Sequence, residues 1–356
     1  MKRITYISWA NDLSPKQIQQ IREVSVKNNS YNGITGVLLC LKGLFFQILE
    51  GDGERVDKLY EKILVDERHR DILCLKTELD VTEKMFPDWG MKTINLDEQE
   101  GIILEPIKSL LFTIAESHRI LEKYTQPSVI NIITQGIDPL TVAPHIVEKI
   151  IFFSDIVSFS TFSEKLPVDK VVNLVNHYLT ICTEIISAHG GEVIKFIGDC
   201  VMAGFSTNQA DAAISTGLEI LAELKSLREL TEVNDPLHFL YTGIGLSCGN
   251  VIEGNIGSPV KMDYTLLGDA VNVASRLEAL SRHLPYSMIL STEVKNYCCT
   301  PWSFINLGRH QMKGKQTLVE IFAINDSIVR KSSDASQIAN FIAQALDMIA
   351  FKPQIK

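Results

Sequence analysis

Two aspartates set into apolar, strand-like stretches most constrain what this chain can fold into. Asp155 follows Phe153-Ser154, and Asp199 stands 44 positions later at the end of Phe196-Ile197-Gly198. A carboxylate in apolar surroundings is costly unless a cation or hydrogen bonds compensate it. Mg²⁺ and Mn²⁺ prefer oxygen ligands and complete their shells with water and substrate phosphates. The pair therefore predicts strand ends that meet around divalent metal, although Asp199 alone also fits a hairpin-turn residue.

The composition narrows the class of protein. A length of 356 residues suggests two or three domains, and 46% hydrophobic residues permit a large core. A net charge of −9 argues against nucleic-acid binding. We expect no membrane span, because no apolar run approaches the roughly 20 residues needed. Seven cysteines without a Cys-x-x-Cys pair favour a reduced, cytoplasmic setting.

The first hundred residues predict a small sheet. Apolar runs at residues 3–8, 34–41, 44–50 and 71–80 are typical of strands, and we expect a last strand over 85–96 that carries Trp89 and Met91. Ser14-Pro15 is a helix start, and residues 53–67 form an amphipathic helix. The order β-α-β-β-α-β-β predicts a ferredoxin-like sheet with helices on one face.

Residues 101–124 predict a helix with an apolar stripe close to a 3.5-residue period. The stripe fits two arrangements, a helix packed on its own domain or a connector that forms a dimer. The stripe contains Ile103, Ile107, Leu110, Leu111, Ile114, His118 and Leu121.

A second domain is expected from about residue 146. The hairpin 192–197/200–205 would hold Gly198-Asp199 at its tip. Further elements are helices at 168–189, 208–229 and 269–282 and strands at 150–159, 237–247, 287–292, 302–307 and 317–324. We expect four segments in an α+β chain: a sensor at 1–98, a helical connector at 99–145, an α/β catalytic domain at 146–326 and a polar tail at 327–356. The tail has a possible helix at 336–351.

Residues 151–323 resemble the catalytic domain of class III nucleotidyl cyclases. The resemblance rests on the two aspartate motifs and on Tyr264-Thr265-Leu266-Leu267-Gly268-Asp269-Ala270-Val271-Asn272-Val273-Ala274-Ser275-Arg276. It implies that Asp155, Asp199 and the carbonyl of Ile156 hold two Mg²⁺ or Mn²⁺ ions. The implied reaction joins the ribose 3′-hydroxyl of the substrate to its own phosphate, giving a 3′,5′-cyclic nucleotide and pyrophosphate.

The same resemblance implies how the substrate is read. Lys195 and Thr265 fit the edge of adenine, because an ammonium only donates hydrogen bonds and a hydroxyl can accept one. Asn272 would orient the ribose, and Arg276 and Lys313 would meet phosphate. Without a ligand, Lys195 is simply a solvated strand residue and Thr265 a sheet residue. Family members take metal ligands and base readers from opposite protomers, so we expect an ATP-using homodimer.

Residues 1–96 resemble a BLUF domain, which binds a flavin such as FAD and senses blue light. The resemblance implies flavin contacts from Tyr6, Asn29, Gln47 and Met91, and from Arg68 and His69 toward the polar tail of the flavin. Without flavin, Tyr6 is a core phenol and Gln47 an inward amide that needs a buried partner. Trp9 is a possible competing electron donor. The supporting motifs are Asn28-Asn29-Ser30, Gly33-Ile34-Thr35-Gly36, Phe46-Gln47-Ile48-Leu49-Glu50-Gly51, Asp66-Glu67-Arg68-His69 and Trp89-Gly90-Met91.

Sensor, connector and cyclase in this order resemble the bacterial photoactivated adenylate cyclases. The implied activity is blue-light-driven conversion of ATP to 3′,5′-cyclic AMP. Lys195 and Thr265 disfavour a guanylate cyclase, and a diguanylate cyclase would need a Gly-Gly-Asp-Glu-Phe sequence that does not occur. A non-catalytic light-regulated scaffold would be expected to lack one of the site residues. Gly243-Ile244-Gly245 with Gly249 is not a dinucleotide fingerprint, because its spacing is wrong and it falls within a predicted strand.

Overall fold

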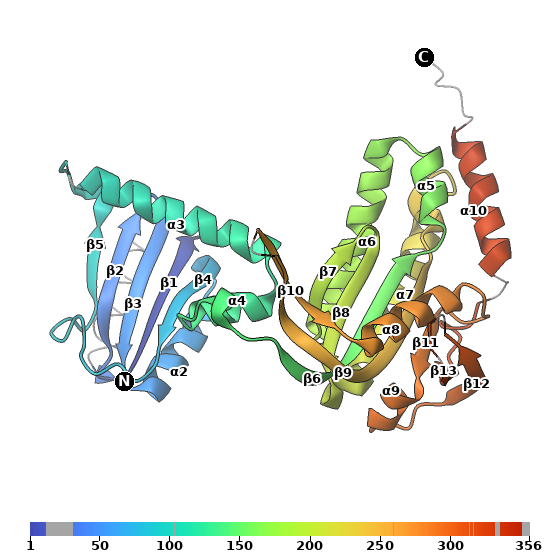
Figure 1. The fold of residues 1–356 in the computed structure, drawn as a ribbon. Helices are drawn as coiled ribbons and strands as arrows, with labels where there is room; N and C mark the ends of the chain where they lie inside the picture. Colours follow the sequence, from blue (N-terminus) through green and yellow to red (C-terminus); the bar gives the residue numbers. More distant parts are fainter. Residues whose placement is uncertain are drawn as a thin grey trace, which may run out of the picture. The chain divides into compact units, whose positions relative to one another are not determined.

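The computed structural model describes residues 1–11, 31–102, 104–258, 260–312, 314–315, 317–331 and 335–350. The chain divides into two compact units, Met1–Val142 and Ala143–Lys356 (Figure 1). Each unit has its own sheet and core. The helix predicted at Ser14-Pro15 and the candidate residues Asn29 and Lys313 lie outside the described residues.

The first unit is built on a five-stranded sheet of order β4-β1-β3-β2-β5. Neighbouring strands are antiparallel except β2 and β5, which run parallel. The β2–β3 hairpin predicted from the sequence is present. The elements are β1 (Lys2–Ala10), β2 (Thr35–Leu41), β3 (Leu44–Gly51), α2 (Gly53–Leu64), β4 (His69–Glu78), β5 (Lys92–Asn95), η1 (Leu96–Glu98), α3 (Leu104–Tyr124), α4 (Pro127–Thr134) and η2 (Pro139–Thr141).

Helices pack against both faces of this sheet. Successive strand residues point to opposite faces, so Tyr6 belongs to the cluster that contains Val56 of α2, while Ile7 belongs to the cluster that contains Ala115 of α3. Trp9 lies on the α3 side, with its ring 6.1 Å from that of Phe112. Figure 1 shows α3 running across the sheet. The predicted helix at 101–124 is confirmed, whereas the expectation of helices on one face alone is wrong once α3 is included.

The last strand is shorter than predicted. It begins at Lys92, so Trp89 and Met91 lie in the segment before it. Pro87 has no N–H to donate to a ladder, and Gly90 is a poor strand former. The segment is nevertheless tied to the sheet, because the carbonyl of Trp89 accepts from the Gly36 N–H at 2.9 Å.

The second unit contains an eight-stranded sheet. Seven strands follow the order β12-β13-β11-β9-β6-β8-β7, and β10 pairs with the far part of β9. The elements are β6 (His145–Ile156), α5 (Phe159–Lys165), α6 (Val168–Ala188), β7 (Glu192–Ile197), β8 (Cys200–Ser206), η3 (Thr207–Gln209), α7 (Ala210–Leu230), η4 (Pro236–Phe239), β9 (Thr242–Ser258), β10 (Lys261–Leu267), α8 (Asp269–Ser281), β11 (Met288–Ser291), α9 (Thr292–Tyr297), β12 (Phe304–Gln311), β13 (Leu318–Ile324) and α10 (Ala335–Ala350).

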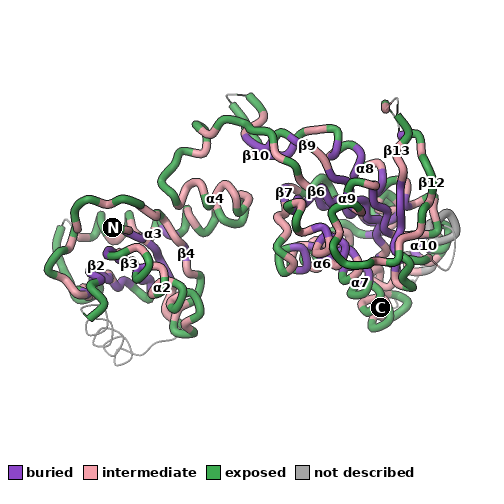
Figure 2. The backbone as a smooth tube through the Cα atoms, turned by 90° about the horizontal axis from the view of Figure 1, so that it is seen from below, coloured by how far each residue is buried: buried purple, intermediate pink, exposed green. Residues whose placement is uncertain are grey.

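Strand β6 is covered on both faces, which explains its continuous apolar run. Phe152 packs into the cluster that contains residues of α6 and α7, and Phe153 packs on the other side against residues of α8. Buried residues concentrate in the central strands in Figure 2. The predicted terminal helix is confirmed as α10, and its Ile342 and Leu346 are fully buried in the α6–α7 cluster. Part of the predicted polar tail therefore belongs to the core of this unit.

Strand β9 runs farther than predicted. It continues from Thr242 to Ser258 and turns into β10, instead of ending near residue 247. Gly257 permits the close pairing near the turn, because a Cβ atom there would lie 2.3 Å from the Lys261 carbonyl oxygen. None of the described helices is long and apolar enough to cross a membrane.

Candidate functional site

The fold brings the two aspartates of the sequence motifs together. Asp155 lies near the end of β6, and Asp199 lies at the tip of the β7–β8 hairpin, where Gly198 takes a φ of +68°. Strand β6 pairs directly with β8, with Ser154 opposite Val201. The predicted hairpin is therefore confirmed, and its tip stands beside the end of β6.

The two carboxyl groups interact and remain incompletely satisfied. The buried oxygens Asp155 Oδ1 and Asp199 Oδ2 have no hydrogen-bond partner among the described residues. Burial, and then the neighbouring Asp155 carboxyl, raise the pKa of Asp199 to about 7. No third His, Cys, Asp or Glu joins the pair within the described part of the chain. Two orphaned carboxylate oxygens beside the Ile156 backbone suit a divalent cation that completes its shell from outside the protein.

Asp155 is held from one side by an ion pair that sequence reasoning missed. Arg282 Nη2 contacts Asp155 Oδ2 and also Glu278 Oε1 at 3.1 Å. Burial raises the pKa of Glu278 to about 7, while Arg282 opposes that rise. In the sequence, the spacing of Glu278 and Arg282, one helical turn apart, indicates that the two side chains can pair. Only the tertiary structure places both beside Asp155.

A buried cluster of hydroxyl groups supports the backbone of Asp155. Thr242 Oγ1 donates to the Asp155 carbonyl at 2.9 Å. The same oxygen lies 2.8 Å from the Tyr178 hydroxyl and 3.0 Å from Ser154 Oγ, and these two hydroxyls are 2.7 Å apart. All three side chains are buried. These buried hydrogen bonds therefore hold the end of β6, which carries Asp155, in place.

The two predicted base readers lie near each other on neighbouring elements. Lys195 Nζ on β7 contacts Asp263 Oδ2 on β10 at 3.3 Å. Thr265 is two residues from Asp263 on the same strand, so their side chains share a face. Thr265 is 9% exposed, whereas the Asp263 side chain is 59% exposed. In this structure Asp263 is the partner of Lys195.

Helix α8 presents Asn272 and Arg276 away from the core. Val273, Ala274 and Leu277 are buried, whereas Asn272 is exposed and Arg276 half-buried. A Cβ atom at Gly314 would lie 3.6 Å from Arg276 Nη2, so Gly314 lies beside this guanidinium.

The glycines of Gly243-Ile244-Gly245 allow α8 to pack on β9. A Cβ atom at Gly245 would lie 2.2 Å from the Ala274 carbonyl oxygen. The motif lies within β9, as predicted, and its role is close helix–strand contact.

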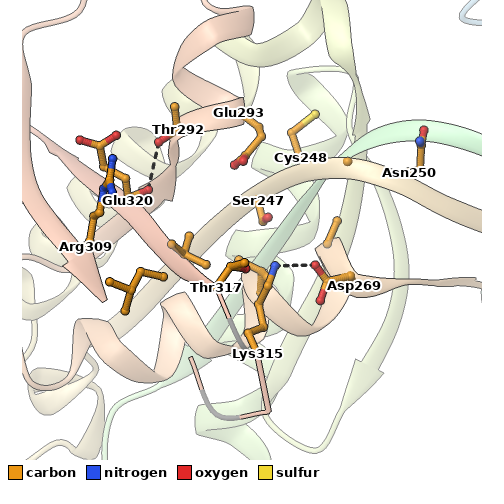
Figure 3. Close-up of a pocket in the computed structure, with 15 residues that line it drawn as sticks. Ser247, Cys248, Asn250, Asp269, Thr292, Glu293, Arg309, Lys315, Thr317 and Glu320 are labelled. Carbon is orange, nitrogen blue, oxygen red and sulfur yellow. Dashed lines mark hydrogen bonds and ion pairs between the residues drawn. The ribbon is translucent and has the colours of Figure 1, made fainter. Parts of the chain in front are cut away.

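A cavity of about 660 Å³ lies at the start of α8, between β9, β12 and β13 (Figure 3). Its lining has mixed charge, and Lys315 Nζ binds Asp269 Oδ2 at 2.6 Å. Asp155, Asp199, Lys195, Thr265, Asn272 and Arg276 are absent from its lining. The cavity is therefore separate from the predicted catalytic residues.

In the first unit, Tyr6, Gln47 and Met91 form a buried hydrogen-bond chain. The Tyr6 hydroxyl donates to Gln47 Oε1, and Gln47 Nε2 donates to Met91 Sδ at 3.4 Å. Burial raises the pKa of Tyr6 well above its usual value. The buried partner that the sequence required for Gln47 is thus provided by protein groups. The Tyr60 ring lies 5.3 Å from that of Tyr6.

Arg68 and His69 are engaged locally in this structure. Arg68 Nε donates to Asp66 Oδ1 at 2.8 Å, and His69 Nδ1 lies 2.9 Å from Ser8 Oγ. Trp9, the possible competitor of Tyr6, packs in the cluster on the opposite face of the sheet.

Glu50 anchors the segment that leads to Trp89 and Met91. Its buried carboxylate accepts from the backbone N–H groups of Met85 and Phe86 at 2.9 and 2.5 Å, and from Arg3 Nε at 3.0 Å. The sequence shows Glu50 inside an apolar strand but does not identify these partners.

Comparison with known proteins agrees with this geometry. Residues 1–92 match the family model of BLUF domains, described as sensors of blue light using FAD, and residues 142–326 match that of the adenylate and guanylate cyclase catalytic domain. Two solved structures of a bacterial light-regulated adenylyl cyclase are similar over 97% of this chain, each with a TM-score of 0.92. Their identities are 61% and 60%, and the matches cover 99% and 100% of those chains.

Curated relatives from Euglena gracilis are more distant. The beta subunit of photoactivated adenylate cyclase is 31% identical over 82% of this chain and 34% of its own length. The alpha subunit is 32% identical over 82% of this chain and 29% of its own length. The chain thus spans about a third of the length of the curated relatives it matches. The chain belongs to the adenylate and guanylate cyclase catalytic domain family and carries a BLUF domain on the N-terminal side of its cyclase domain.

Proposed function

We propose that this protein is a blue-light-activated adenylate cyclase that converts ATP to 3′,5′-cyclic AMP and pyrophosphate. The observation that carries the proposal is the pair Asp155 and Asp199, whose buried oxygens lack partners among the described residues, within a fold of this family. We assign residues 1–98 to the light sensor, 99–145 to the connector, 146–326 to the cyclase domain and 327–356 to a C-terminal tail.

Asp155, Asp199 and the Ile156 carbonyl would hold two Mg²⁺ or Mn²⁺ ions. When bound, such ions supply activation of the attacking hydroxyl and stabilisation of the triphosphate. Arg282 holds Asp155 in orientation, and the Thr242 hydroxyl fixes its backbone. Asp155 Oδ1 and Asp199 Oδ2, which have no partner among the described residues, remain available for ligation.

Lys195 and Thr265 would select adenine. The Lys195 ammonium donates to a ring nitrogen, and the Thr265 hydroxyl accepts from the exocyclic amine. Guanine offers a carbonyl and an N–H at these edges, which fits less well. Asn272 would orient the ribose, and the forked guanidinium of Arg276 would bind phosphate together with Lys313.

We infer that the active enzyme is a homodimer. Asn272 and Arg276 lie on the face of α8 that the core leaves uncovered. On α3, Phe112 and Ala115 face the sheet of their own unit, yet Ile107, Leu110 and Ile114 are 44%, 58% and 37% exposed. These apolar residues support the proposal that the helix also meets a second copy, in addition to packing on its own unit.

In the sensor, Tyr6, Gln47 and Met91 would contact FAD together with Asn29, Arg68 and His69. Bound flavin would supply blue-light absorption and an excited state that accepts an electron. The Tyr6 hydroxyl donates a hydrogen bond to Gln47 Oε1, and the Gln47 amide can both donate and accept. Reversal of the Gln47 amide would break its bond to Met91, next to the segment held by Glu50.

One experiment tests both halves of the proposal. The purified full-length chain, reconstituted with FAD, is examined by visible absorption and assayed with ATP and Mg²⁺ in darkness and in blue light. We expect a yellow protein that forms cyclic AMP faster in light. A colourless protein would refute the sensor assignment, and unchanged ATP after illumination would refute the enzyme assignment.

A further inference from the structure

A second cavity of the cyclase unit has an unusual balance of charge. It measures about 490 Å³ and lies between the end of α7, the residues around the start of β9 and the segment after β13. Among its described lining residues, Glu229 is the single carboxylate, and the imidazole of His238 is also present. The lysines and arginines of the lining are Lys225, Arg228, Arg330 and Lys331.

The cavity of Figure 3 provides a comparison within the same unit. There the carboxylates of Asp269, Glu293 and Glu320 outnumber the cations of Arg309 and Lys315. The whole chain carries a net charge of −9. A concentration of four cations around one cavity therefore runs against the charge of the molecule and marks this cavity as attractive to anions.

Arg228 shows why an anion fits there. Its Nη1 donates to the Leu240 carbonyl at 2.7 Å, and its guanidinium lies 4.0 Å from the centroid of the Tyr241 ring. Burial lowers its pKa, and Tyr241 and the Glu229 carboxylate oppose that fall, although no carboxylate oxygen of the described residues lies within ion-pair distance of the guanidinium. A half-buried guanidinium that forms no ion pair with a described residue is only partly compensated, and an anionic ligand would offset the cost of its burial.

The other cations also line the cavity. Lys225 Nζ lies 3.9 Å from Glu229 Oε1, which is close to the limit of an ion pair. Lys331 Nζ donates to the Ser281 carbonyl at 2.6 Å, and this contact positions the ammonium. Ser287 and Ser327 add hydroxyl groups to the lining.

We propose that this cavity binds a small anion that carries two or more phosphate groups. Arginine forks and lysine ammonium groups bind phosphate oxygens well. None of the residues proposed for catalysis lines the cavity. It nevertheless shares a wall with the metal-binding region, because its lining residue Thr242 donates to the Asp155 carbonyl at 2.9 Å. The site is thus separate from the catalytic residues and lies behind one of them, and the binding proposal does not depend on the proposed enzyme activity.

The test is calorimetric titration of the full-length chain with inorganic pyrophosphate in the presence of EDTA. The chelator removes metal-dependent binding at the carboxylate pair. We expect saturable binding of one pyrophosphate per chain that weakens as the salt concentration rises. The double variant Lys225→Glu/Arg330→Glu should bind about tenfold more weakly or worse, because two charge-assisted contacts become repulsive. If the double variant does not fold, each of the two single variants should also bind pyrophosphate more weakly, with a smaller loss of affinity.

Two controls distinguish binding in this cavity from general attraction of anions and from binding at the catalytic residues. Lys170→Glu/Lys261→Glu makes the same change of net charge at exposed positions outside the cavity and should bind as the unmodified protein does. Arg276→Ala removes a cation of the proposed catalytic site and should also leave binding intact. The proposal is overturned by absence of saturable binding up to about 10 mM pyrophosphate, by unaltered binding in the cavity variants, or by an equal loss in either control.

Discussion

The two units treat the polar groups of their candidate sites differently. In the BLUF domain, the Tyr6 hydroxyl donates to Gln47, and Gln47 donates to Met91, so the buried groups satisfy one another. In the cyclase domain, one oxygen of Asp155 and one of Asp199 are buried without any partner among the described residues. We call the first arrangement closed, because its polar groups bind one another, and the second open, because these two oxygens have no partner among the described residues.

This difference reflects two kinds of task. A closed chain of hydrogen bonds can exist in two arrangements of similar energy, because an amide offers both a donor and an acceptor. An open pair of carboxylates has no favourable state of its own and gains stability from a cation. We therefore expect changes in the sensor to affect switching, and changes in the cyclase pair to affect the reaction itself.

The largest effect is expected from Asp199→Asn. An amide carries no charge for the metal, so turnover of ATP should fall by about 10³-fold, with the yellow colour unchanged. Initial rates of cyclic AMP formation under saturating light measure this. Asp169→Asn, in the exposed first turn of α6, is the matched control and should keep full activity. Retained turnover in Asp199→Asn would remove its metal role.

The second test addresses the closed chain. Tyr6→Phe removes the hydroxyl that donates to Gln47, so the rates in light and darkness should become equal while dark turnover persists. Tyr60→Phe is the control, since its ring lies beside Tyr6 without taking part in the chain of hydrogen bonds to Met91. A light response that survives in Tyr6→Phe would contradict the sensor mechanism, as would its equal loss in Tyr60→Phe.

A smaller effect should follow from changing the base readers. Lys195→Glu with Thr265→Cys removes both proposed adenine contacts, and the preference for ATP over GTP should fall by about ten- to a hundredfold. The ratio of kcat/KM for the two nucleotides measures this. Asp263→Asn, which alters the partner of Lys195 outside the proposed contacts, should change the ratio much less. An unchanged ratio in the double variant would place base selection elsewhere.

The smallest effect is on stability as a function of pH. The pKa of Asp199 is raised from 3.8 to about 7, so between these values the folded metal-free protein binds more protons than the unfolded chain. Its stability should therefore fall as the pH rises through this window and then level off. Thermal unfolding in EDTA from pH 5 to pH 8 measures the trend, and Mg²⁺ should restore more stability at pH 8 than at pH 5.

Asp199→Asn should flatten this dependence, leaving the contribution of Glu278, whose raised pKa of about 7 has the same sign. Glu278→Gln is the complementary variant and should remove that remaining part. If the stability of the metal-free protein rose with pH over this range, the raised pKa values of Asp199 and Glu278 would be contradicted.

Much of the fold follows from local patterns. The β2–β3 and β7–β8 hairpins and helices α2, α3, α6, α7, α8 and α10 were predicted within a few residues, because their apolar periods and glycine turns are strong local signals. The predicted last strand of the first unit was too long, because it included Pro87 and Gly90. The β9–β10 hairpin was missed, since exposed edge strands have a weak apolar pattern.

The sequence by itself determined which residue types can perform the chemistry and the local elements that carry them, as with Asp155 on a strand, Asp199 at a hairpin tip, and Asn272 with Arg276 on one helix. Only the tertiary structure decided which groups meet across long separations. It placed Arg282 on Asp155, Thr242 behind its backbone and Met91 on Gln47. It also set the depth of burial, and with it the pKa of Asp199. Local propensity depends on near neighbours along the chain, whereas desolvation and pairing depend on what the fold brings within a few ångströms.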